Sequence, residues 1–304
     1  MGSVGYNGGR ACGWENGPLT TRPRRTPEWL RVKIRKSSLG RETSERLARH
    51  GVSTVCANAK CPNIGECYHS GTATFLLMGE RCTRGCGFCA VGSLEPEALD
   101  PTEPERVAAA AAELGLSHVV ITSVTRDDVA DGGAAHFAAT VDAVRRKLPE
   151  ATIEVLVPDF AGDEEAVAVV CDAGVDVFNH NVETVPRLYP EVRPGADYRR
   201  SLRVLELAGR LRPETPTKSG VMLGLGEERE EVLAVMDDLR SVGCEILTLG
   251  QYLQPSPRHL PVARFVPPEE FGELGEAARR KGFGFVASDP FVRSSYRAHE
   301  ALDD

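Results

Sequence analysis

Short apolar runs alternate with helical stretches from residue 73 onward. The apolar runs are almost continuous and do not alternate with polar residues, which is typical of parallel strands that are buried on both faces. They predict strands at 73–79, 118–123, 152–157, 175–181, 217–224 and 245–250. Helical periodicity predicts helices at 105–114, 134–148, 164–173, 198–210, 229–242 and 268–280, followed by a short apolar run at 283–287. Six successive β/α units predict a barrel or an open doubly wound sheet.

Polar residues gather at the carboxyl ends of these predicted strands, which is where barrel enzymes place their chemistry. The residues concerned are Thr122, Ser123, Asn181, Glu183, Gly224 and Gln251. Each of them alone could be a loop residue or a helix cap, but four strand ends that converge predict a functional site. Glu154 is different, because it lies inside a predicted apolar strand, where a carboxylate is costly to bury without a partner.

The composition is that of an ordinary globular protein, with 41% hydrophobic and 26% charged residues among 304. No apolar run approaches the roughly 20 residues needed to cross a bilayer, so we predict no membrane partner. The formal net charge of −8 argues against nucleic acid as a partner. Residues 1–25 are predicted to be a disordered leader that lacks the pattern of a transit peptide.

Six of the nine cysteines fall into two triplets, Cys56/Cys61/Cys67 and Cys82/Cys86/Cys89. A cubane iron–sulfur cluster takes four protein ligands, usually thiolates, so three cysteines leave one iron open to a substrate or an unusual ligand. A structural zinc site is the alternative for the first triplet, with His69 as its fourth ligand. Disulfides are disfavoured, because nothing at the start of the chain reads as a secretory signal. The triplets therefore predict a redox enzyme of the reducing cytoplasm.

The second triplet, in the spacing CxxxCxxC, opens directly after the first predicted strand. Small residues in this loop let three sulfurs converge, and Phe88 can shield one side of a cluster from water. These features resemble the radical S-adenosylmethionine enzymes. The glycine-rich stretch at 220–227 is similar to a motif of the fifth strand in that superfamily, and it follows the cysteine motif in the expected place.

Both triplets together resemble a narrower group, the lipoyl synthase family. The first triplet, in the stretch Val-Cys-Ala-Asn-Ala-Lys-Cys-Pro-Asn-Ile-Gly-Glu-Cys at 55–67, is similar to that family's auxiliary-cluster segment. Further similar motifs occupy 71–75, 121–128, 131–134, 153–160, 179–189, 217–220, 250–256 and, as Arg-Ser-Ser-Tyr, 293–296. The resemblance covers about 26–298, which is nearly the whole chain.

The resemblance implies two [4Fe–4S] clusters with separate roles. Cys82, Cys86 and Cys89 would hold the cluster that binds and cleaves S-adenosylmethionine, while Cys56, Cys61 and Cys67 would hold an auxiliary cluster. The fourth ligand of the auxiliary cluster would be a serine of the Arg-Ser-Ser-Tyr motif, which we assign to Ser295, with Ser294 as the other choice. A serine oxygen is a harder ligand than thiolate and matches iron less well, so this corner of the cluster should release first.

The resemblance also implies the reaction, the cofactors and the partners. A 5′-deoxyadenosyl radical from S-adenosylmethionine would start the insertion of two sulfur atoms, at C6 and C8, into an octanoyl chain on a lysine of a lipoyl carrier domain, with the auxiliary cluster as sulfur source. Such domains occur in the E2 subunits of 2-oxoacid dehydrogenases and in the H protein of glycine cleavage. Ferredoxin or flavodoxin would donate electrons, and an iron–sulfur carrier would rebuild the cluster. Candidate contacts of S-adenosylmethionine are Phe88, Thr122, Ser123, Glu154, Asn181, Glu183, Gly224 and Gln251.

The predicted fold is a partial (β/α)6 barrel of the TIM type. An extension at 26–72 would carry the auxiliary-cluster cysteines, and a domain at 73–304 would form the barrel, with a C-terminal segment that folds back over its mouth. Two alternatives remain at this point. One is a paralogous radical enzyme that inserts sulfur into a different substrate, and the other is a non-catalytic protein that stores or carries metal or an iron–sulfur cluster.

Overall fold

The computed structural model of the chain describes residues 26–31, 38–58, 61, 63–69, 73–92, 95–295 and 298. Residues 26–31 belong to a small unit in which Glu28–Leu30 form a 3₁₀ helix. The remaining described residues belong to the unit Val32–Asp304. Residues from 32 onward of the predicted extension share one compact unit with the barrel, while 26–31 belong to the small unit. The predicted leader at 1–25 lies outside the described residues.

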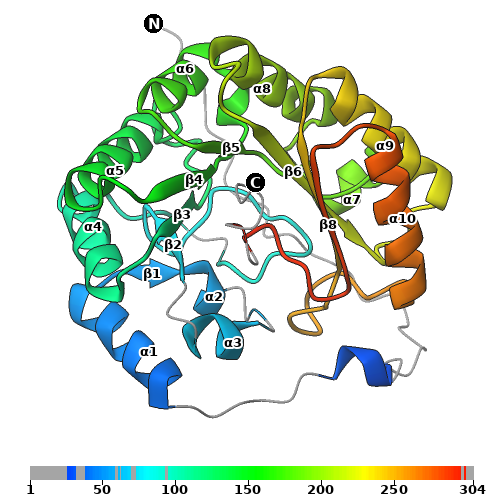
Figure 1. Ribbon diagram of the computed structural model, residues 1–304, viewed down its shortest axis with the longest axis horizontal. Coiled ribbons are helices and arrows are strands. Elements are labelled where there is room, and N and C mark those ends of the chain that lie inside the picture. The colour runs from blue at the N-terminus through cyan, green and yellow to red at the C-terminus, as the bar shows by residue number, and fades with distance from the viewer. Residues whose placement is uncertain are drawn as a thin grey trace, which may run out of the picture. The chain divides into compact units, whose positions relative to one another are not determined.

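An eight-stranded sheet forms the centre of the larger unit, with its strands in the order of the chain. The strands are β1 (Ser53–Thr54), β2 (Thr74–Leu77), β3 (His118–Ser123), β4 (Thr152–Leu156), β5 (Val177–Asn179), β6 (Thr217–Leu223), β7 (Ile246–Gln251) and β8 (Phe285–Ser288). β1 pairs with β2 antiparallel, and every later neighbouring pair is parallel. The sheet curves around a central space but stays open between its first and last strands, as a partial barrel does (Figure 1).

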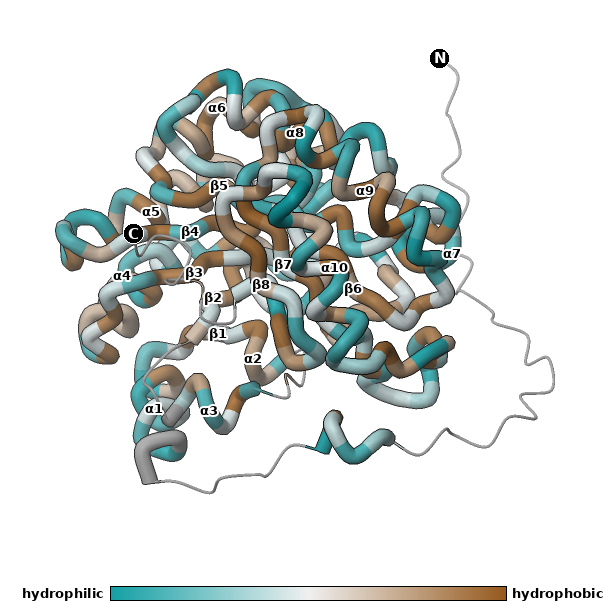
Figure 2. Tube along the Cα trace, turned by 45° about the vertical axis from the view of Figure 1, so that its right-hand side comes forward, coloured by the Kyte–Doolittle hydropathy of each residue, from teal (hydrophilic) through white to brown (hydrophobic). Residues whose placement is uncertain are grey.

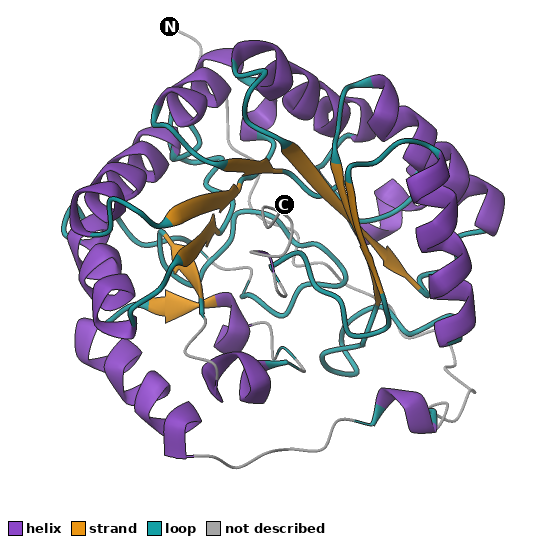
Figure 3. Ribbon diagram, in the orientation of Figure 1, coloured by secondary structure: helices purple, strands orange, loops and turns teal. Residues whose placement is uncertain are grey.

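Helices cover the outer side of this sheet (Figure 3). Those that connect successive parallel strands are α4 (Glu103–Leu114), α5 (Ala134–Lys147), α6 (Glu164–Asp172), α8 (Tyr198–Leu211), α9 (Arg229–Ser241) and α10 (Pro268–Arg280), and the shorter α7 (Tyr189–Val192) precedes α8. The extension contributes α1 (Ser38–His50), α2 (Val55–Asn58) and α3 (Ile64–His69). Short 3₁₀ helices lie at Phe160–Gly162 and Pro186–Leu188. In the described part of the chain, no helix is both long and apolar enough to span a bilayer.

Apolar side chains between sheet and helices form the core, and much of the central strands carries the hydrophobic colour in Figure 2. Phe75, Ile121 and Val155 are fully buried there. Burial on this scale is the main favourable term in folding, at about 25 cal/mol per Å² of apolar surface. The start of α6 follows from the local sequence, because the Asp163 carboxylate accepts hydrogen bonds from the backbone N–H groups of Glu165 and Ala166.

All six predicted strands and all six predicted helices are confirmed, within a few residues at their ends. The apolar run at 283–287 is a seventh parallel strand, β8, which the count of six β/α units did not include. β1 was not predicted, because two residues carry no periodicity. Its place depends on antiparallel pairing with β2, a tertiary contact that local sequence does not specify.

A buried ion pair crosses the inside of the barrel. The Lys218 ammonium on β6 lies 2.8 Å from the carboxylate of Glu154 on β4, and both side chains are about 1–2% exposed. Burial acts to raise the pKa of Glu154, but the charge of Lys218 and hydrogen bonds from its neighbours outweigh burial and lower it below its ordinary value of 4.5. The stability that this pair contributes is therefore present above about pH 4.5 and is lost as the pH falls through the lower folded-state pKa.

We expect Lys218→Ala to destabilise the protein by about 3–5 kcal/mol, because it leaves the Glu154 carboxylate buried without its counter-charge. Urea denaturation at neutral pH measures this change. The matched control is the double variant Glu154→Gln with Lys218→Met, which removes both charges and should recover most of the loss. A single variant as stable as the wild type would contradict a charged pair.

The C-terminal segment after β8 folds back over the barrel mouth, as predicted. The backbone N–H of Gln251 donates to the Pro290 carbonyl at 3.2 Å, and the Asn63 amide of the extension donates to the Phe291 carbonyl at 2.8 Å. A side chain at Gly250 would collide with the carbonyl of Val292, so glycine is required for this close approach. The segment thereby joins β7 to the cysteine-bearing extension, and Figure 1 shows it inside the ring of strands.

Candidate metal centres at the barrel mouth

The second triplet lies on the loop that follows β2. The backbone N–H of Cys82 donates to the Gly92 carbonyl at 2.8 Å, which closes the loop at its base. The Cys82 sulfur in turn accepts hydrogen bonds from the N–H groups of Arg84 at 3.4 Å and Thr125 at 3.3 Å. Donors of this kind stabilise a thiolate, which is the form that binds metal.

The three thiols of this loop lie close enough to influence one another. Burial raises the pKa of Cys89 to about 12, and the charges of Cys86 and Cys82 act in the same direction. Burial also raises the pKa of Cys86, while the nearby Arg193 guanidinium opposes the rise. Burial thus favours the protonated forms of Cys86 and Cys89, so cluster binding there must displace protons.

Arg84, between the first two cysteines, anchors the loop to two strand ends. Its guanidinium donates to the Asp127 carboxylate at 2.8 and 2.9 Å and lies 2.7 Å from a carboxylate oxygen of the fully buried Asp159. Asp127 follows β3 and Asp159 follows β4, so one side chain ties the cysteine loop to both. Arg84 was not predicted as a site residue, although acidic residues after two successive strands were a usable signal.

The loop after β7 packs against the same cysteine loop. The N–H of Leu260 donates to the Gly87 carbonyl at 2.9 Å, and a ring nitrogen of His259 lies 2.9 Å from the Cys89 carbonyl. Phe88 is half-buried and packs against the apolar cluster that residues of β6, β7, α9 and α10 form, a position from which it can shield a cluster. The cysteine loop is thus held from both sides of the barrel opening.

Glu183, after β5, lies close to the second triplet. Its backbone has φ of 66°, a left-handed conformation that costs a non-glycine residue free energy and often marks a functional site. Burial raises the pKa of its carboxyl, with Arg193 opposing, and its charge acts on both Cys86 and Cys89. Asn181 donates to the Glu183 carboxylate at 3.2 Å, so these two predicted contacts of S-adenosylmethionine lie together.

The other predicted contacts differ in what their side chains can still bind. The Thr122 hydroxyl donates to the Leu156 carbonyl at 2.7 Å, and the Gln251 amide bonds to backbone groups, including the Val266 N–H at 2.8 Å. The buried Ser123 hydroxyl has no hydrogen-bond partner among the described residues. A side chain at Gly224 would collide with Gln251, so that glycine shapes the loop. Ser123 is therefore the side chain of this group with an unused polar atom for a ligand.

The first triplet lies on the extension. Cys56 belongs to α2 and Cys67 to α3, and the N–H of Cys61 between them donates to the Cys56 carbonyl at 3.1 Å. Burial raises the pKa of Cys67 to about 12, and the charges of Cys56 and Cys61 add to the effect, so the three thiols lie close together. The side chain of His69, the candidate zinc ligand, lies outside what the structure describes.

The two serines of the C-terminal motif lie beside different groups. Thr74 donates to the Ser295 hydroxyl at 2.9 Å. Burial raises the pKa of the Cys56 thiol and hydrogen bonding from Thr74 opposes the rise, so Thr74 lies near Cys56 as well. Ser294 instead bonds to Asn179 and Asn181 of the barrel. Ser295 is thus the serine that lies on the side of the first triplet.

The residues present fit two iron–sulfur clusters by donor chemistry, because each group offers three soft sulfur donors. In the stretches that the structure describes, no group of three or more His, Cys, Asp or Glu side chains is arranged to hold one metal ion. Cluster thiolates bind different irons and need not meet at a single point.

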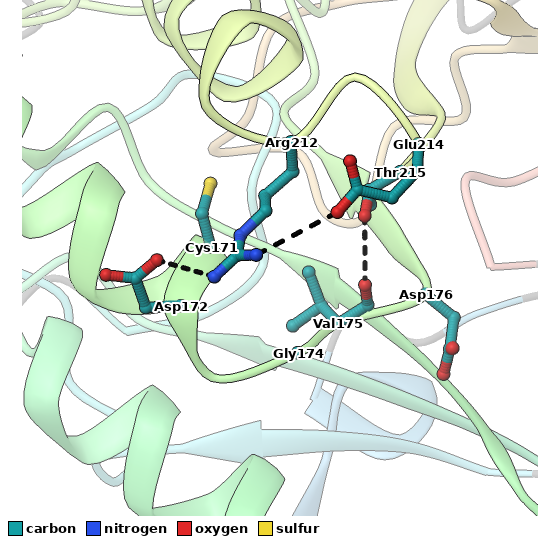
Figure 4. Close-up of a pocket in the computed structure, with 8 residues that line it drawn as sticks. All are labelled: Cys171, Asp172, Gly174, Val175, Asp176, Arg212, Glu214 and Thr215. Atoms are coloured by element: carbon teal, nitrogen blue, oxygen red, sulfur yellow. Dashed lines mark hydrogen bonds and ion pairs between the residues drawn. The ribbon is translucent and has the colours of Figure 1, made fainter.

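Cys171 and Cys244 stand apart from both triplets. Each is almost fully buried in the apolar core, and burial raises the pKa of each thiol to about 12. Cys171 also lines a pocket of about 450 Å³ beside the Arg212–Asp172 ion pair (Figure 4). This pocket lies at the amino ends of β5 and β6, opposite the barrel mouth. Residues at that end of a barrel usually serve stability and not catalysis.

We expect the double variant Cys171→Ala with Cys244→Ala to bind as much iron as the wild type after anaerobic reconstitution. Each change removes a small buried side chain and should cost about 1 kcal/mol of stability. Iron content measures the first effect, and urea denaturation the second. Loss of a whole cluster's iron would show that one of these thiols is a ligand.

The fold and the paired triplets define a radical S-adenosylmethionine enzyme. Residues 76–239 match the model of the Radical SAM superfamily. The crystal structure of methylornithine synthase has the same fold, with a TM-score of 0.54 at 14% identity over 86% of this chain and 81% of that one. A [4Fe–4S] cluster and S-adenosylmethionine are the cofactors of this superfamily.

The chain belongs to the lipoyl synthase family. It is 55% identical to the lipoyl synthase of Caldanaerobacter subterraneus subsp. tengcongensis over 278 residues, which cover 91% of this chain and 97% of that protein. It is 52% identical to the lipoyl synthase of Rubrobacter xylanophilus, over 91% of this chain and 87% of that protein. The reaction of this family is the insertion of sulfur into octanoyl chains by radical chemistry.

Proposed function

We propose that the two cysteine triplets divide this reaction between them. Cys82, Cys86 and Cys89 would hold the cluster at which S-adenosylmethionine binds. Cys56, Cys61, Cys67 and Ser295 would hold an auxiliary cluster that supplies the sulfur. The observation that carries the proposal is the hydrogen bond from Thr74 to Ser295, because Thr74 also lies near Cys56, whose pKa it acts to lower against the effect of burial.

S-adenosylmethionine bound at the Cys82/Cys86/Cys89 site would supply the 5′-deoxyadenosyl radical that removes hydrogen from the octanoyl chain. The protein's own part is to bind, orient and exclude water. Arg84 and the loop after β7 hold the cysteine loop in place. Ser123, Asn181 and Glu183 offer polar groups to the bound molecule at the ends of β3 and β5.

The auxiliary site requires a ligand that releases iron when sulfur leaves. A serine oxygen suits this role, because it matches iron less well than thiolate does. Arg293, next in the chain to the serines, is half-buried near Cys61, and burial lowers the pKa of its guanidinium. Its charge favours an anionic sulfur cluster at this position.

The substrate would be an octanoylated lipoyl carrier domain, either of a 2-oxoacid dehydrogenase E2 subunit or of the H protein of glycine cleavage. A reduced ferredoxin or flavodoxin would supply electrons, and an iron–sulfur carrier would rebuild the auxiliary cluster. The electron donor is needed because cleavage of the sulfonium consumes an electron, and the carrier is needed because the auxiliary cluster is consumed. A reducing cytoplasm is the compartment that suits such sites.

The test is anaerobic reconstitution followed by a reaction with an octanoyl-lysyl peptide, S-adenosylmethionine and reductant. We expect about eight irons and eight sulfides per chain, from two clusters. Mass spectrometry should show a peptide that has gained two sulfur atoms. One cluster per chain, or stoichiometric zinc, would reject the two-cluster assignment, and an unchanged octanoyl peptide would indicate a paralogue with another substrate.

A further inference from the structure

Ser294 and Ser295 are adjacent in the chain but bond to opposite sides of the barrel mouth. The Ser295 hydroxyl accepts from Thr74 on β2, at 2.9 Å. The Ser294 hydroxyl accepts from the Asn179 amide on β5 at 2.7 Å, and donates to the Asn181 amide oxygen at 3.0 Å. Two neighbouring hydroxyls thus bridge strands that are three positions apart in the sheet.

The contacts of Ser294 belong to a hydrogen-bonded chain inside the barrel. The Asn179 side chain is fully buried, and its NH₂ group donates to the Glu154 carboxylate at 2.8 Å as well as to Ser294. Glu154 is in turn held by Lys218 at 2.8 Å. The far end of the chain is the bond from Asn181 to the Glu183 carboxylate.

The direction of every bond in this chain follows from its ends. An ionised carboxylate only accepts hydrogen bonds, so the NH₂ group of Asn179 must face Glu154. Its second hydrogen then faces the Ser294 oxygen, and the Ser294 proton is left for the Asn181 oxygen. Since the ion pair on β4 and β6 fixes Asn179, it also fixes where the Ser294 hydroxyl can sit.

We propose that Ser294 is a positioning residue, which holds the C-terminal segment so that Ser295 lies beside Thr74 and the first cysteine triplet. The inference rests on the proposed function of Ser295 as a cluster ligand. A hydroxyl is a poor ligand for iron, and a poor ligand stays bound only if it is held in place. The two hydrogen bonds of Ser294 supply that restraint from the barrel side.

The first test measures how fast the auxiliary site gives up iron. All proteins carry Cys86→Ala, so that the iron comes from the first triplet, and a chelator is added after anaerobic reconstitution. We expect Ser294→Ala to release iron about tenfold faster, the effect of losing one or two hydrogen bonds. The matched control is Ser288→Ala. It removes a hydroxyl on β8 that donates to the Phe271 carbonyl of α10 at 2.6 Å, and this protein should release iron at the unaltered rate.

A double-mutant cycle separates positioning from a general structural effect. If Ser294 acts through Ser295, the variant Ser294→Ala with Ser295→Ala should release iron no faster than Ser295→Ala alone. Effects that simply add would overturn the proposal. So would a Ser294→Ala protein that cannot be distinguished from the Ser288→Ala control.

The second test needs no cluster, so it stands even if the proposed function fails. Hydrogen–deuterium exchange is measured by mass spectrometry on the iron-free proteins, for peptides that cover 289–295. We expect faster exchange there in Ser294→Ala than in the wild type, and no change in Ser288→Ala. Equal exchange in all three would show that Ser294 does not restrain the segment. Faster exchange together with iron release at the unaltered rate would overturn the proposal, because the loosened segment would then have no effect on the cluster.

Discussion

Cys86→Ala should abolish cleavage of S-adenosylmethionine while iron still binds at the first triplet. The change removes one of three thiolates from the loop after β2, and the two that remain cannot hold a cubane with an open iron. We expect 5′-deoxyadenosine formation to fall to the background of the assay. Iron content should fall by about half, to roughly four per chain. Analysis of 5′-deoxyadenosine by liquid chromatography, beside iron and sulfide determination, measures both effects.

Cys61→Ala is the matched control for this experiment, because it removes the middle cysteine of the other triplet. It should leave 5′-deoxyadenosine formation measurable and prevent sulfur insertion into the octanoyl peptide. Comparable iron loss with opposite effects on cleavage would establish separate roles for the two triplets. If both variants lose only cleavage, the division proposed for the triplets is wrong.

Ser295→Ala should lower sulfur insertion by about 100-fold or more and leave cleavage of S-adenosylmethionine measurable. Even residues that only support a ligand contribute about 10–100-fold to metal affinity or activity, and Ser295 is proposed as a ligand itself. Ser295→Cys should retain the auxiliary cluster but release sulfur poorly, because thiolate is the better-matched ligand. Product and 5′-deoxyadenosine yields are measured for both variants in the same reaction.

Ser294→Ala serves as the comparison, since its hydroxyl bonds to Asn179 and Asn181 and not to the first triplet. We expect it to lower sulfur insertion less than Ser295→Ala does. Full product from Ser295→Ala beside an inactive Ser294→Ala would move the ligand by one residue. Full product from both single variants and from the double variant would remove serine ligation from the mechanism.

The strands and helices of the barrel could be predicted from the chain alone, because burial of parallel strands on both faces leaves continuous apolar runs. The two cysteine triplets could be found for a similar reason, since each is local in sequence. Their assignment as cluster ligands stays a prediction, which the cysteine variants test. Glu154 was recognised as a carboxylate in need of a partner. That the partner is Lys218, 64 residues later, was not predicted, because no local pattern specifies which strands face each other across a barrel.

The class of fold, the two cysteine triplets and the family of the chain could all be recognised without the structure. The tertiary structure decided the contacts that join them: Arg84 with Asp127 and Asp159, and the two serines with opposite sides of the mouth. Ser294 and Ser295 are adjacent in one motif and equivalent in chemistry, so the motif alone leaves both as possible ligands. Curvature of the sheet brings β2 and β5 to the same opening, and only there does one hydroxyl meet Thr74 while its neighbour meets Asn179.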